Sequence, residues 1–203
     1  MRDETDSPAP PRYLIRTARH EDIDRVLAII RRRQQWLAGQ GIDQWRDYET
    51  FFPRSYFVRR VEAGELLVAL DDREQVCGAI ARMEQDPHWS GREVPGALYL
   101  HNLVASPEAA GAGAALLDFC RRSACDEGYT VLRLDCQADN AHLNRYYQRR
   151  GFLAAGTCVN GSYRGILREL PLGQEPQPGE AGGNENDPPD PADKKGQTET
   201  TIP

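Results

Sequence analysis

Residues 103–117, with the sequence LVASPEAAGAGAALL, have a composition suited to binding a phosphate group. An apolar run ends at Pro107, a loop of small residues carries Gly111 and Gly113, and a helical pattern follows at once. Backbone can approach a phosphate closely in such a loop, and the N–H groups and positive dipole of the helix start then face it. Close packing of the helix explains the same residues equally well, and the Lys-[Ser/Thr] end of a P-loop is missing. This segment alone leaves both interpretations open.

A second segment, DNAHLNRYYQRRGF at residues 139–152, makes the first more informative. Together they resemble the Gcn5-related N-acetyltransferase (GNAT) superfamily, in which a pyrophosphate loop precedes an N-(x)6-Y-x-x-x-G-F element. Here that element is Asn140, Tyr147, Gly151 and Phe152. The family loop usually begins with Gln or Arg, where this chain has Ala110. A charge-assisted phosphate contact contributes about 1.5–3 kcal/mol, so the alanine predicts weakened, not abolished, coenzyme binding.

The resemblance implies acetyl transfer from acetyl-coenzyme A to an amine, with no metal. It places Tyr147, rather than Tyr146, as the acid that protonates the leaving thiolate. It also implies that a backbone N–H near Leu103 or Val104 faces the thioester carbonyl, and that Asn140 is structural or contacts the coenzyme. The residues expected at the coenzyme are Leu103, Val104, Ala105, Ala110, Gly111, Ala112, Gly113, Ala114, Ala115, Asn140 and Tyr147.

The candidate base is His101. The strand YLHNL resembles the YLED-type strand of members that acetylate polyamines, and His101 takes the place of their glutamate. A histidine side chain ordinarily titrates near ~6.5, which suits a base at neutral pH. A histidine in a buried strand is more often a satisfied core residue, so that alternative stays open.

Candidate acceptor-binding residues are Trp36 and Trp45, in the segment WLAGQGIDQW, and Asp135, which could attract a cationic amine. Aromatic anchoring of a loop explains the tryptophans equally well, and a solvated strand end explains Asp135. The arginine run at residues 31–33 predicts a solvated helix face.

The elements that position these residues follow from apolar periodicity. Strands are predicted at 13–17, 65–72, 74–84, 97–105, 130–137, 151–159 and 163–170, with the strand at 97–105 buried on both faces. Helices are predicted after the first strand, at 53–64, after Pro107 up to Gly128, and from an Asp139 cap to residue 150, with a loop at 39–50. The fold class is therefore α/β (α+β), a GNAT fold with a mixed, mostly antiparallel sheet of about seven strands flanked by about four helices.

Composition sets the domain limits. A GNAT domain is predicted at 13–171, after a flexible leader at 1–12 and before a disordered Pro/Gly-rich tail at 172–203. That tail holds seven acids and two lysines, which accounts for −5 of the net charge of −6. The near-neutral domain argues against a nucleic-acid partner. The chain has no apolar run of membrane-spanning length and no signal peptide, which predicts a cytoplasmic protein without a membrane partner.

The five cysteines are predicted to be buried thiols in neither a disulfide nor a zinc site, and their spacing suggests no Cys–His pair for nucleophilic catalysis. The leading hypothesis is an N-acetyltransferase that acts on a primary amine of a small molecule through a ternary complex. The alternatives are a non-catalytic acyl-coenzyme A sensor or partner-binding module, and an acetyltransferase for protein N-termini or lysines. The sequence leaves a homodimer open.

Overall fold

The computed structural model describes residues 13–42, 44–45 and 48–173. The predicted leader and nearly all of the predicted tail lie outside the described residues. The strands are β1 (Leu14–Thr17), β2 (Leu66–Leu70), β3 (Val76–Met83), β4 (Ala97–Ala105), β5 (Val131–Gln137), β6 (Leu153–Asn160) and β7 (Tyr163–Pro171). The helices are α1 (Ile23–Gly39), α2 (Tyr48–Phe51), α3 (Arg54–Glu62), α4 (Ala112–Asp126) and α5 (Ala141–Arg149), with 3-10 turns η1 (His20–Asp22) and η2 (Pro87–Trp89).

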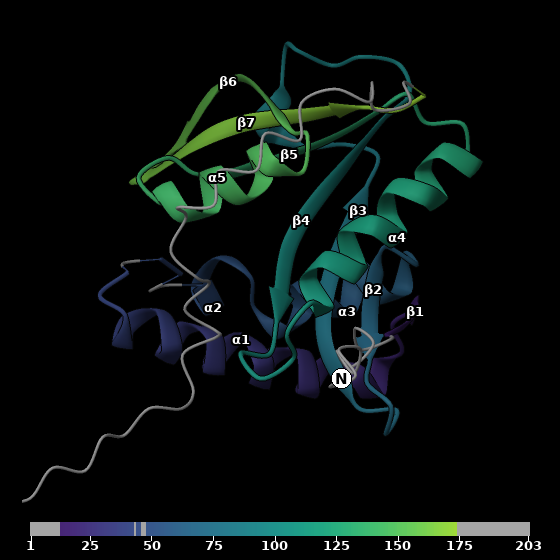
Figure 1. Ribbon diagram of the computed structural model, residues 1–203, viewed down its shortest axis with the longest axis vertical. Coiled ribbons are helices and arrows are strands. Elements are labelled where there is room, and N and C mark those ends of the chain that lie inside the picture. The colour runs from purple at the N-terminus through teal and green to yellow at the C-terminus, as the bar shows by residue number, and fades with distance from the viewer. Residues whose placement is uncertain (1–12, 43, 46–47, 174–203) are drawn as a thin grey trace, which may run out of the picture. The chain divides into compact units, whose positions relative to one another are not determined.

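The seven strands form one sheet in the order β1-β2-β3-β4-β5-β7-β6. Every neighbouring pair is antiparallel except β4 and β5, which confirms the predicted mixed, mostly antiparallel sheet. The parallel pair is short, running only from Ala97 opposite Val131 to Tyr99 opposite Arg133. In Figure 1, β5 continues beside β7 near α5, whereas β4 runs on toward α1. The sheet is therefore splayed open along the second half of β4.

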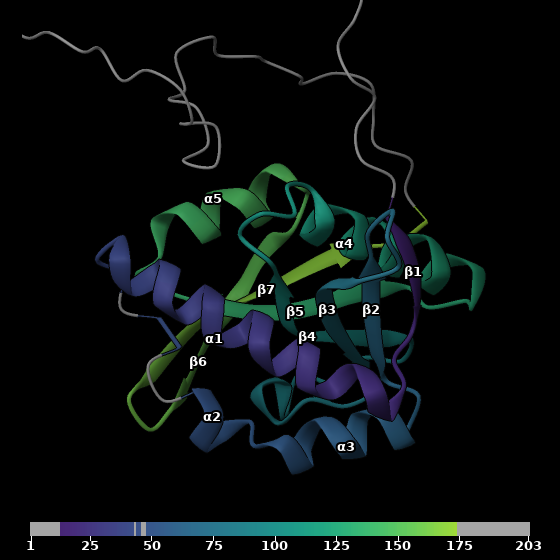
Figure 2. The ribbon, with the colours of Figure 1, turned by 90° about the horizontal axis from the view of Figure 1, so that it is seen from below.

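Helices cover both faces of the sheet (Figure 2). On one face, α4 and α5 pack over what we call the α4–α5 core, which includes Leu98, Leu100, Leu116, Leu132 and Tyr147. On the other face, α1 and α3 cover the α1–α3 core, which includes Ile23, Ile30, Phe57, Val68 and Val104. A third cluster, the η2 core, continues that second face with Trp89, Ala97, Tyr99, Val131, Cys158 and Leu167. Side chains alternate along a strand, so the second half of β4 contributes side chains to both faces of the sheet.

Four local predictions were wrong. The predicted loop at 39–50 contains the start of α2, a fifth helix. The cap of α5 is Asn140, whose side chain accepts a hydrogen bond from the Leu143 amide, and not Asp139. Strand β4 is buried on both faces only up to Leu100, because residues 101–103 border the splay. Cys125 is exposed, although all five cysteines are free as predicted.

Candidate active site

The start of α4 presents unused backbone donors. Gly111 precedes the helix with φ +84°, a left-handed conformation that favours glycine. Within the described part of the chain, the amides of Gly111, Gly113 and Ala114 have no hydrogen-bond acceptor. A Cβ on Gly113 would lie 3.9 Å from that of Ala105, so this helix start packs closely on the end of β4. The predicted phosphate loop therefore has both the donors and the close packing that the two sequence interpretations required.

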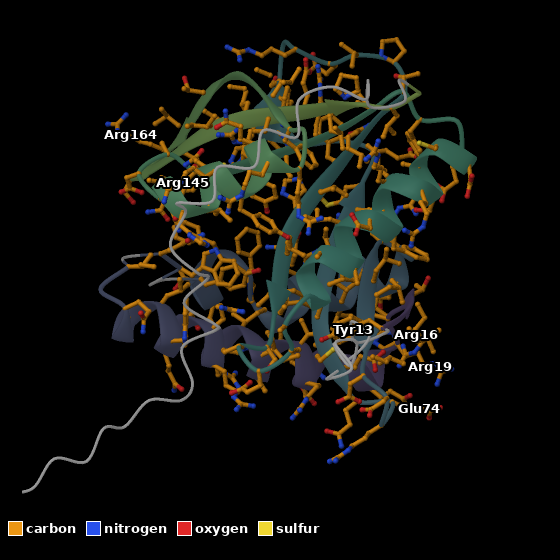
Figure 3. The ribbon with its side chains drawn as sticks, in the orientation of Figure 1. Tyr13, Arg16, Arg19, Glu74, Arg145 and Arg164 are labelled. Atoms are coloured by element: carbon orange, nitrogen blue, oxygen red, sulfur yellow. The ribbon has the colours of Figure 1, made fainter. Side chains whose placement is uncertain are left out.

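The loop before α4 is held by Tyr13, whose hydroxyl donates to the Ala110 carbonyl oxygen at 2.7 Å. Tyr13 lies beside the start of α4 in Figure 3. Tyr13 lies just before β1, 97 positions earlier in the sequence, so a distant segment fixes the carbonyl group of the residue before Gly111. The Ala110 side chain is a methyl group at an exposed position, so no charge from this residue supplements the amides.

Arginines of α1 reach the same loop. Arg31 and Arg32 are exposed, as predicted for a solvated helix face, whereas Arg33 is half-buried. The Arg33 guanidinium donates two hydrogen bonds to the Ala105 carbonyl oxygen, at 2.8 and 3.1 Å. Arg32 pairs with Glu108 at 2.7 Å, and Arg31 pairs with Glu49 at 2.6 Å. Two of the three guanidinium groups thus bring positive charge to residues 105–108. The side chain at position 110, in the same loop, brings no charge.

Tyr147 lies on α5 within the α4–α5 core and is buried. Its ring meets those of Phe152 and Tyr146 edge-on, with centroids 5.6 and 5.3 Å away. Burial raises the pKa of the Tyr147 phenol well above its usual value, so the phenol keeps its proton at neutral pH. Tyr146 is only half-buried and stacks against the Arg150 guanidinium.

The Gly151–Phe152 pair explains the spacing after Tyr147. Gly151 has φ +84°, and a Cβ there would lie 3.2 Å from a methyl carbon of Leu170, so α5 ends here on a glycine. The amide of Phe152 then donates to the carbonyl oxygen of Tyr147 at 3.0 Å. This turn folds the Phe152 ring back onto Tyr147 and fixes the tyrosine against the sheet.

At its other end α5 contacts the loop after α1. The Asn140 side-chain oxygen caps the Leu143 amide at 2.9 Å, and its amide nitrogen donates to Gln44 at 2.8 Å. One asparagine therefore starts the helix that carries Tyr147 and ties it to the segment between the two helices of the second face.

On that second face, five polar side chains form what we call the histidine–carboxylate cluster: Asp86, His88, His101, Asp135 and Tyr163. His101 Nε2 lies 3.3 Å from Asp86 Oδ2, and His88 Nδ1 lies 3.2 Å from Asp135 Oδ1. The Tyr163 hydroxyl donates to the other oxygen of Asp135. Ligating atoms of Asp86, His101 and Asp135 all lie within 4.8 Å of one another. The structure thus brings two of the predicted site residues, His101 and Asp135, together.

The electrostatics of this cluster favour charged forms of Asp135 and His88. Burial alone would raise the pKa of Asp135, but hydrogen bonds from His88 and Tyr163 and the nearby imidazoles bring it below its usual value. The hydrogen bond to Asp135 raises the pKa of His88. Burial and the Asp135 charge raise the pKa of Tyr163, which remains a neutral donor.

A bulge in β4 separates His101 from the predicted oxyanion donors. The register of β4 against β3 shifts between Ala79 and Ala81, which pair with Val104 and His101, so residues 102–103 fall outside it. Asn102 has φ +55°. Its side chain donates to the Tyr48 hydroxyl at 2.6 Å and accepts from Tyr56 at 2.7 Å. Side chains of α2 and α3 therefore hold the strand in its bulged form.

Comparisons with known proteins decide the family. The model of the acetyltransferase (GNAT) family matches residues 30–152, which is more than half of the chain and spans the α4 loop, the bulge and α5. The chain belongs to the GNAT family. Its family model ends at Phe152, the last residue of the predicted N-(x)6-Y-x-x-x-G-F element.

Similar proteins agree with this assignment. The uncharacterized N-acetyltransferase YesJ of Bacillus subtilis (strain 168) is 26% identical over 151 residues, which are 70% of this chain and 82% of YesJ. A GNAT-family crystal structure from Listeria monocytogenes 4b F2365 matches with a TM-score of 0.66 and 24% identity, over 79% of this chain and 95% of the other. The PaiA N-acetyltransferase of Thermoplasma acidophilum, solved in complex with coenzyme A, matches with a TM-score of 0.63 and 18% identity, over 79% and 99% of the two chains.

The two predicted acceptor-site tryptophans of this GNAT protein differ in position. The Trp45 ring lies 5.0 Å from that of Tyr48, and Tyr48 reaches Asn102, the neighbour of His101. Trp36 instead lies under the guanidinium of Arg33, on its own helix. Trp45 is therefore connected to the histidine–carboxylate cluster through Tyr48 and Asn102, whereas the contact of Trp36 leads toward the α4 loop.

Sequence reasoning missed Asp86, His88 and Tyr163. Asp86 caps η2 by accepting a hydrogen bond from the His88 amide at 2.9 Å, and the Asp-Pro-His sequence was the one available signal for such a cap. It also missed that Cys158 Sγ lies within 4.8 Å of ligating atoms of His88 and Asp135, although spacing had suggested no Cys–His proximity.

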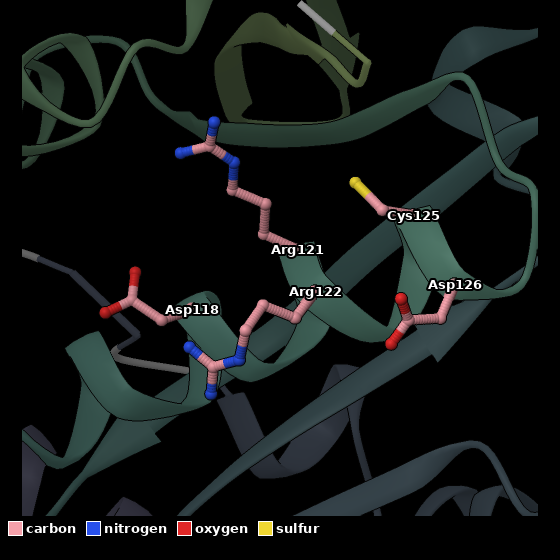
Figure 4. A pocket seen from close by; sticks show the side chains of 5 residues that line it. All are labelled: Asp118, Arg121, Arg122, Cys125 and Asp126. Atoms are coloured by element: carbon pink, nitrogen blue, oxygen red, sulfur yellow. The ribbon is translucent and has the colours of Figure 1, made fainter. Parts of the chain in front are cut away.

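A surface hollow on the outer side of α4 is lined by Asp118, Arg121, Arg122, Cys125 and Asp126. Figure 4 shows Arg121 and Cys125 extending to one side of the helix and Arg122 and Asp126 to the other, with Arg122 reaching back toward Asp118. They converge on no common point, so we place the candidate active site at the splay and not here. Among the described residues, no helix is both long and apolar enough to cross a membrane.

Proposed function

We propose that this GNAT protein transfers the acetyl group of acetyl-coenzyme A to a primary amine of a small molecule, directly and within a ternary complex. One observation carries the proposal. At the splay of β4 from β5, a neutral buried phenol, Tyr147, lies on one face of the sheet and an imidazole beside a carboxylate, His101 with Asp86, lies on the other. Amine acetylation needs a proton acceptor and a proton donor on opposite sides of the reacting carbonyl.

The coenzyme side is supported by the residues at the start of α4. The free amides of Gly111, Gly113 and Ala114, together with the helix dipole, fit a pyrophosphate. The likeness to a Thermoplasma acidophilum acetyltransferase solved with coenzyme A supports the same assignment. Acetyl-coenzyme A would supply the activated acyl group. The bulge at Asn102 supports Leu103 or Val104 as the N–H that faces the thioester oxygen.

On the acceptor side, His101 accepts the proton of the amine. An alkyl ammonium with a pKa near ~10.4 is no nucleophile at neutral pH, so a base must remove a proton before attack. Asp86 faces His101 at 3.3 Å and stabilises the imidazolium that this transfer creates. The Asp135 carboxylate, charged and largely buried, attracts the cationic substrate.

On the coenzyme side, Tyr147 donates a proton to the sulfur that leaves. A phenol can protonate a thiolate whose conjugate acid has a pKa near ~8.5 if it is still protonated when the C–S bond breaks. Burial keeps Tyr147 protonated, as described above. The ammonium loses one proton to His101 before attack, which the imidazolium passes to solvent, and the nitrogen loses a second proton to His101 as the C–N bond replaces the C–S bond. The sulfur gains the Tyr147 proton, and the second His101 proton returns to Tyr147 through solvent, so each turnover releases one proton overall.

Direct transfer is also supported by Cys158, the one cysteine near the cluster. Burial and the Asp135 charge raise the pKa of this thiol to about 11, so it stays protonated at neutral pH. A thiol in that state is a poor nucleophile. An acyl-enzyme on Cys158 is therefore disfavoured, and Cys158→Ser should retain activity.

The test is a thiol-release assay with acetyl-coenzyme A and a panel of small amines, beside peptides with free N-termini or lysines. Calorimetric titration of acetyl-coenzyme A accompanies it. Turnover on a small amine supports the proposal. Turnover on peptides alone would assign the chain to protein acetylation, and coenzyme binding without turnover on any acceptor would leave a non-catalytic sensor.

A further inference from the structure

The histidine–carboxylate cluster contains two buried polar atoms that face each other without a hydrogen bond. Asp86 Oδ2 and His101 Nε2 lie 3.3 Å apart, yet their alignment is wrong for a hydrogen bond, and neither has another partner among the described residues. The Asp86 side chain is only 2% exposed. Leaving a buried polar group without a partner is costly, so both atoms point to a group that binds between them.

We propose that Asp86, His101 and Asp135 form a binding site for a divalent transition-metal ion of the zinc type. The three residues come from the start of η2, from β4 and from β5, and their ligating atoms lie within 4.8 Å of one another. Three segments far apart in the sequence therefore supply one imidazole nitrogen and two carboxylate oxygens to a single point.

This donor set suits zinc, and the spacing of one ligand pair matches it. Zn²⁺ binds His nitrogen and carboxylate oxygen at about 2.0–2.2 Å with tetrahedral geometry, which separates two ligand atoms by about 3.3–3.5 Å. The observed separation of Asp86 Oδ2 and His101 Nε2 is 3.3 Å. Three protein ligands leave a fourth position open. The His88 imidazole compensates the charge of Asp135, and a divalent ion would do the same for the second buried carboxylate, Asp86.

The residues behind these ligands hold them in place. The His88 amide donates to Asp86 Oδ1, which leaves Oδ2 directed at His101. The His88 ring and the Tyr163 hydroxyl engage the two oxygens of Asp135, and the His88 and Tyr163 rings stack with centroids 6.0 Å apart. Hydrogen-bonded partners of this kind orient ligating carboxylates in metal sites.

A second set, His88 with Asp135 and Cys158, lies within the same distance limit. Its imidazole nitrogen, His88 Nδ1, is already engaged with Asp135 at 3.2 Å, so a metal there would have to break that pair. The set with Asp86 and His101 breaks no such hydrogen bond. The observations therefore favour Asp86, His101 and Asp135 as the ligands.

A bound ion would occupy the lone pair of His101 and block deprotonation of an acceptor there. This consequence rests on the proposed function, whereas metal binding itself does not. Zinc should then inhibit acetyl transfer competitively with the amine and not with acetyl-coenzyme A.

The experiment is calorimetric titration of ZnCl₂ into the metal-free full-length chain. We expect one ion per chain and at least a tenfold weaker binding for Asp86→Asn and for Asp135→Asn. The matched controls are His142→Gln and Cys125→Ser, at exposed positions on α5 and α4, which should bind as the parent does. Circular dichroism confirms that each variant is folded. Failure of the parent chain to bind zinc, or equal binding by Asp86→Asn, would overturn the proposal.

Cobalt provides a readout on the unaltered protein. Co²⁺ added to the parent chain should give the visible absorption of a tetrahedral site, and ZnCl₂ should displace it. Absence of that absorption contradicts the assigned ligand geometry. If zinc binds as expected but does not compete with the amine, the metal site stands and the acceptor position in the proposed function is wrong.

Discussion

The two sides of the splay between β4 and β5 present different chemical groups, backbone amides on one side and titratable side chains on the other. At the start of α4 the site consists of backbone amides among alanines and glycines, and residues 110–115 contribute no charged side chain. On the opposite face, five titratable side chains from four segments share one small volume. The first kind of site comes from one continuous stretch and tolerates a change such as Ala110. The second depends on tertiary structure, so each of its side chains should be sensitive to substitution.

The largest loss of turnover is expected on substitution of His101. Replacing it in His101→Gln should lower kcat by about 100-fold or more, because general-base catalysis typically contributes about 10²–10⁴-fold. The dissociation constant of acetyl-coenzyme A should stay within about twofold, since the proposed coenzyme site is on the other face. Thiol release and calorimetry measure the two quantities, with His142→Gln as the exposed control. Equal loss in both variants would remove His101 from catalysis.

A substitution of Tyr147 tests the one side chain that is proposed to act in catalysis on the coenzyme side. Tyr147→Phe should reduce kcat by roughly 10- to 100-fold, because it removes the proton donor and leaves the ring packing on Phe152 intact. Tyr146→Phe, at the half-buried neighbour, should keep near-parental turnover. If Tyr147→Phe releases thiol at the parental rate, the acid lies elsewhere.

The contrast between these sides also decides what the sequence could predict. Asn140, Tyr147, Gly151 and Phe152 lie within 13 residues, and one helix with its cap and its glycine end positions them all. The buried stripe of α4 and the hairpin of β2 and β3 follow from local periodicity in the same way. Local pattern was therefore sufficient for most of the fold and for the placement of these residues on and after α5, while their role toward the coenzyme stays a prediction.

Asp86, His88 and Tyr163 were not predictable by that reasoning. Asp86 and His88 lie in a three-residue turn and its cap, which have too few residues for a periodic signal. Their roles depend on contacts with β4 and β5 that lie 15 and 47 positions away in the sequence, and no local pattern encodes such pairings. The Asn102 bulge was missed for a similar reason, because the two tyrosines that hold it lie 46 and 54 residues away.

Adding a charged side chain to the α4 loop tests whether the backbone amides alone account for coenzyme binding on that side. Ala110→Arg is expected to tighten acetyl-coenzyme A binding about tenfold, since a charge-assisted phosphate contact contributes about 1.5–3 kcal/mol and an exposed side chain realises the lower end. The gain should shrink as salt rises. Ala38→Arg, at an exposed position on α1, is the matched control. An unchanged affinity for Ala110→Arg would mean that Arg32 and Arg33 already supply the charge the phosphates need.

The His88–Asp135 pair predicts a pH-dependent stability. The pKa of Asp135 is lowered on folding, so its contribution is present above ~3.9 and is lost as pH falls through the folded value. The pKa of His88 is raised, so its contribution is full below ~6.5 and is lost as pH rises through the folded value. Asp135→Asn should therefore cost about 1 kcal/mol of unfolding free energy between about pH 4 and pH 6.5, and less at pH 9.

Urea unfolding at pH 5.5 and pH 9 measures this difference, and Asp126→Asn, an exposed acid on α4, is the control. A cost for Asp135→Asn that does not change with pH would show that the pair is not ionised.

The smallest effect is expected where the two sides meet. Gln44→Ala removes the acceptor of the Asn140 side chain, a hydrogen bond worth about 0.5–1.5 kcal/mol. The KM for the amine should rise about two- to fivefold with kcat nearly unchanged. Gln40→Ala, exposed at the end of α1, should leave KM as it is. A fall in kcat without a change in KM would mean that Gln44 acts through α5 and Tyr147.

Asn102 links the proposed acceptor wall to the bulge of β4, so a change in one affects the other. Its side chain is bonded to Tyr48 on α2 and to Tyr56 on α3, and its backbone defines the turn that sets the orientation of the Leu103 amide. Grafting residues 48–56 from a relative to alter substrate choice would release that turn unless both hydroxyls were carried over. In this chain, substrate range and turnover would therefore be difficult to diversify separately, and a library of altered specificity should keep the two tyrosines fixed.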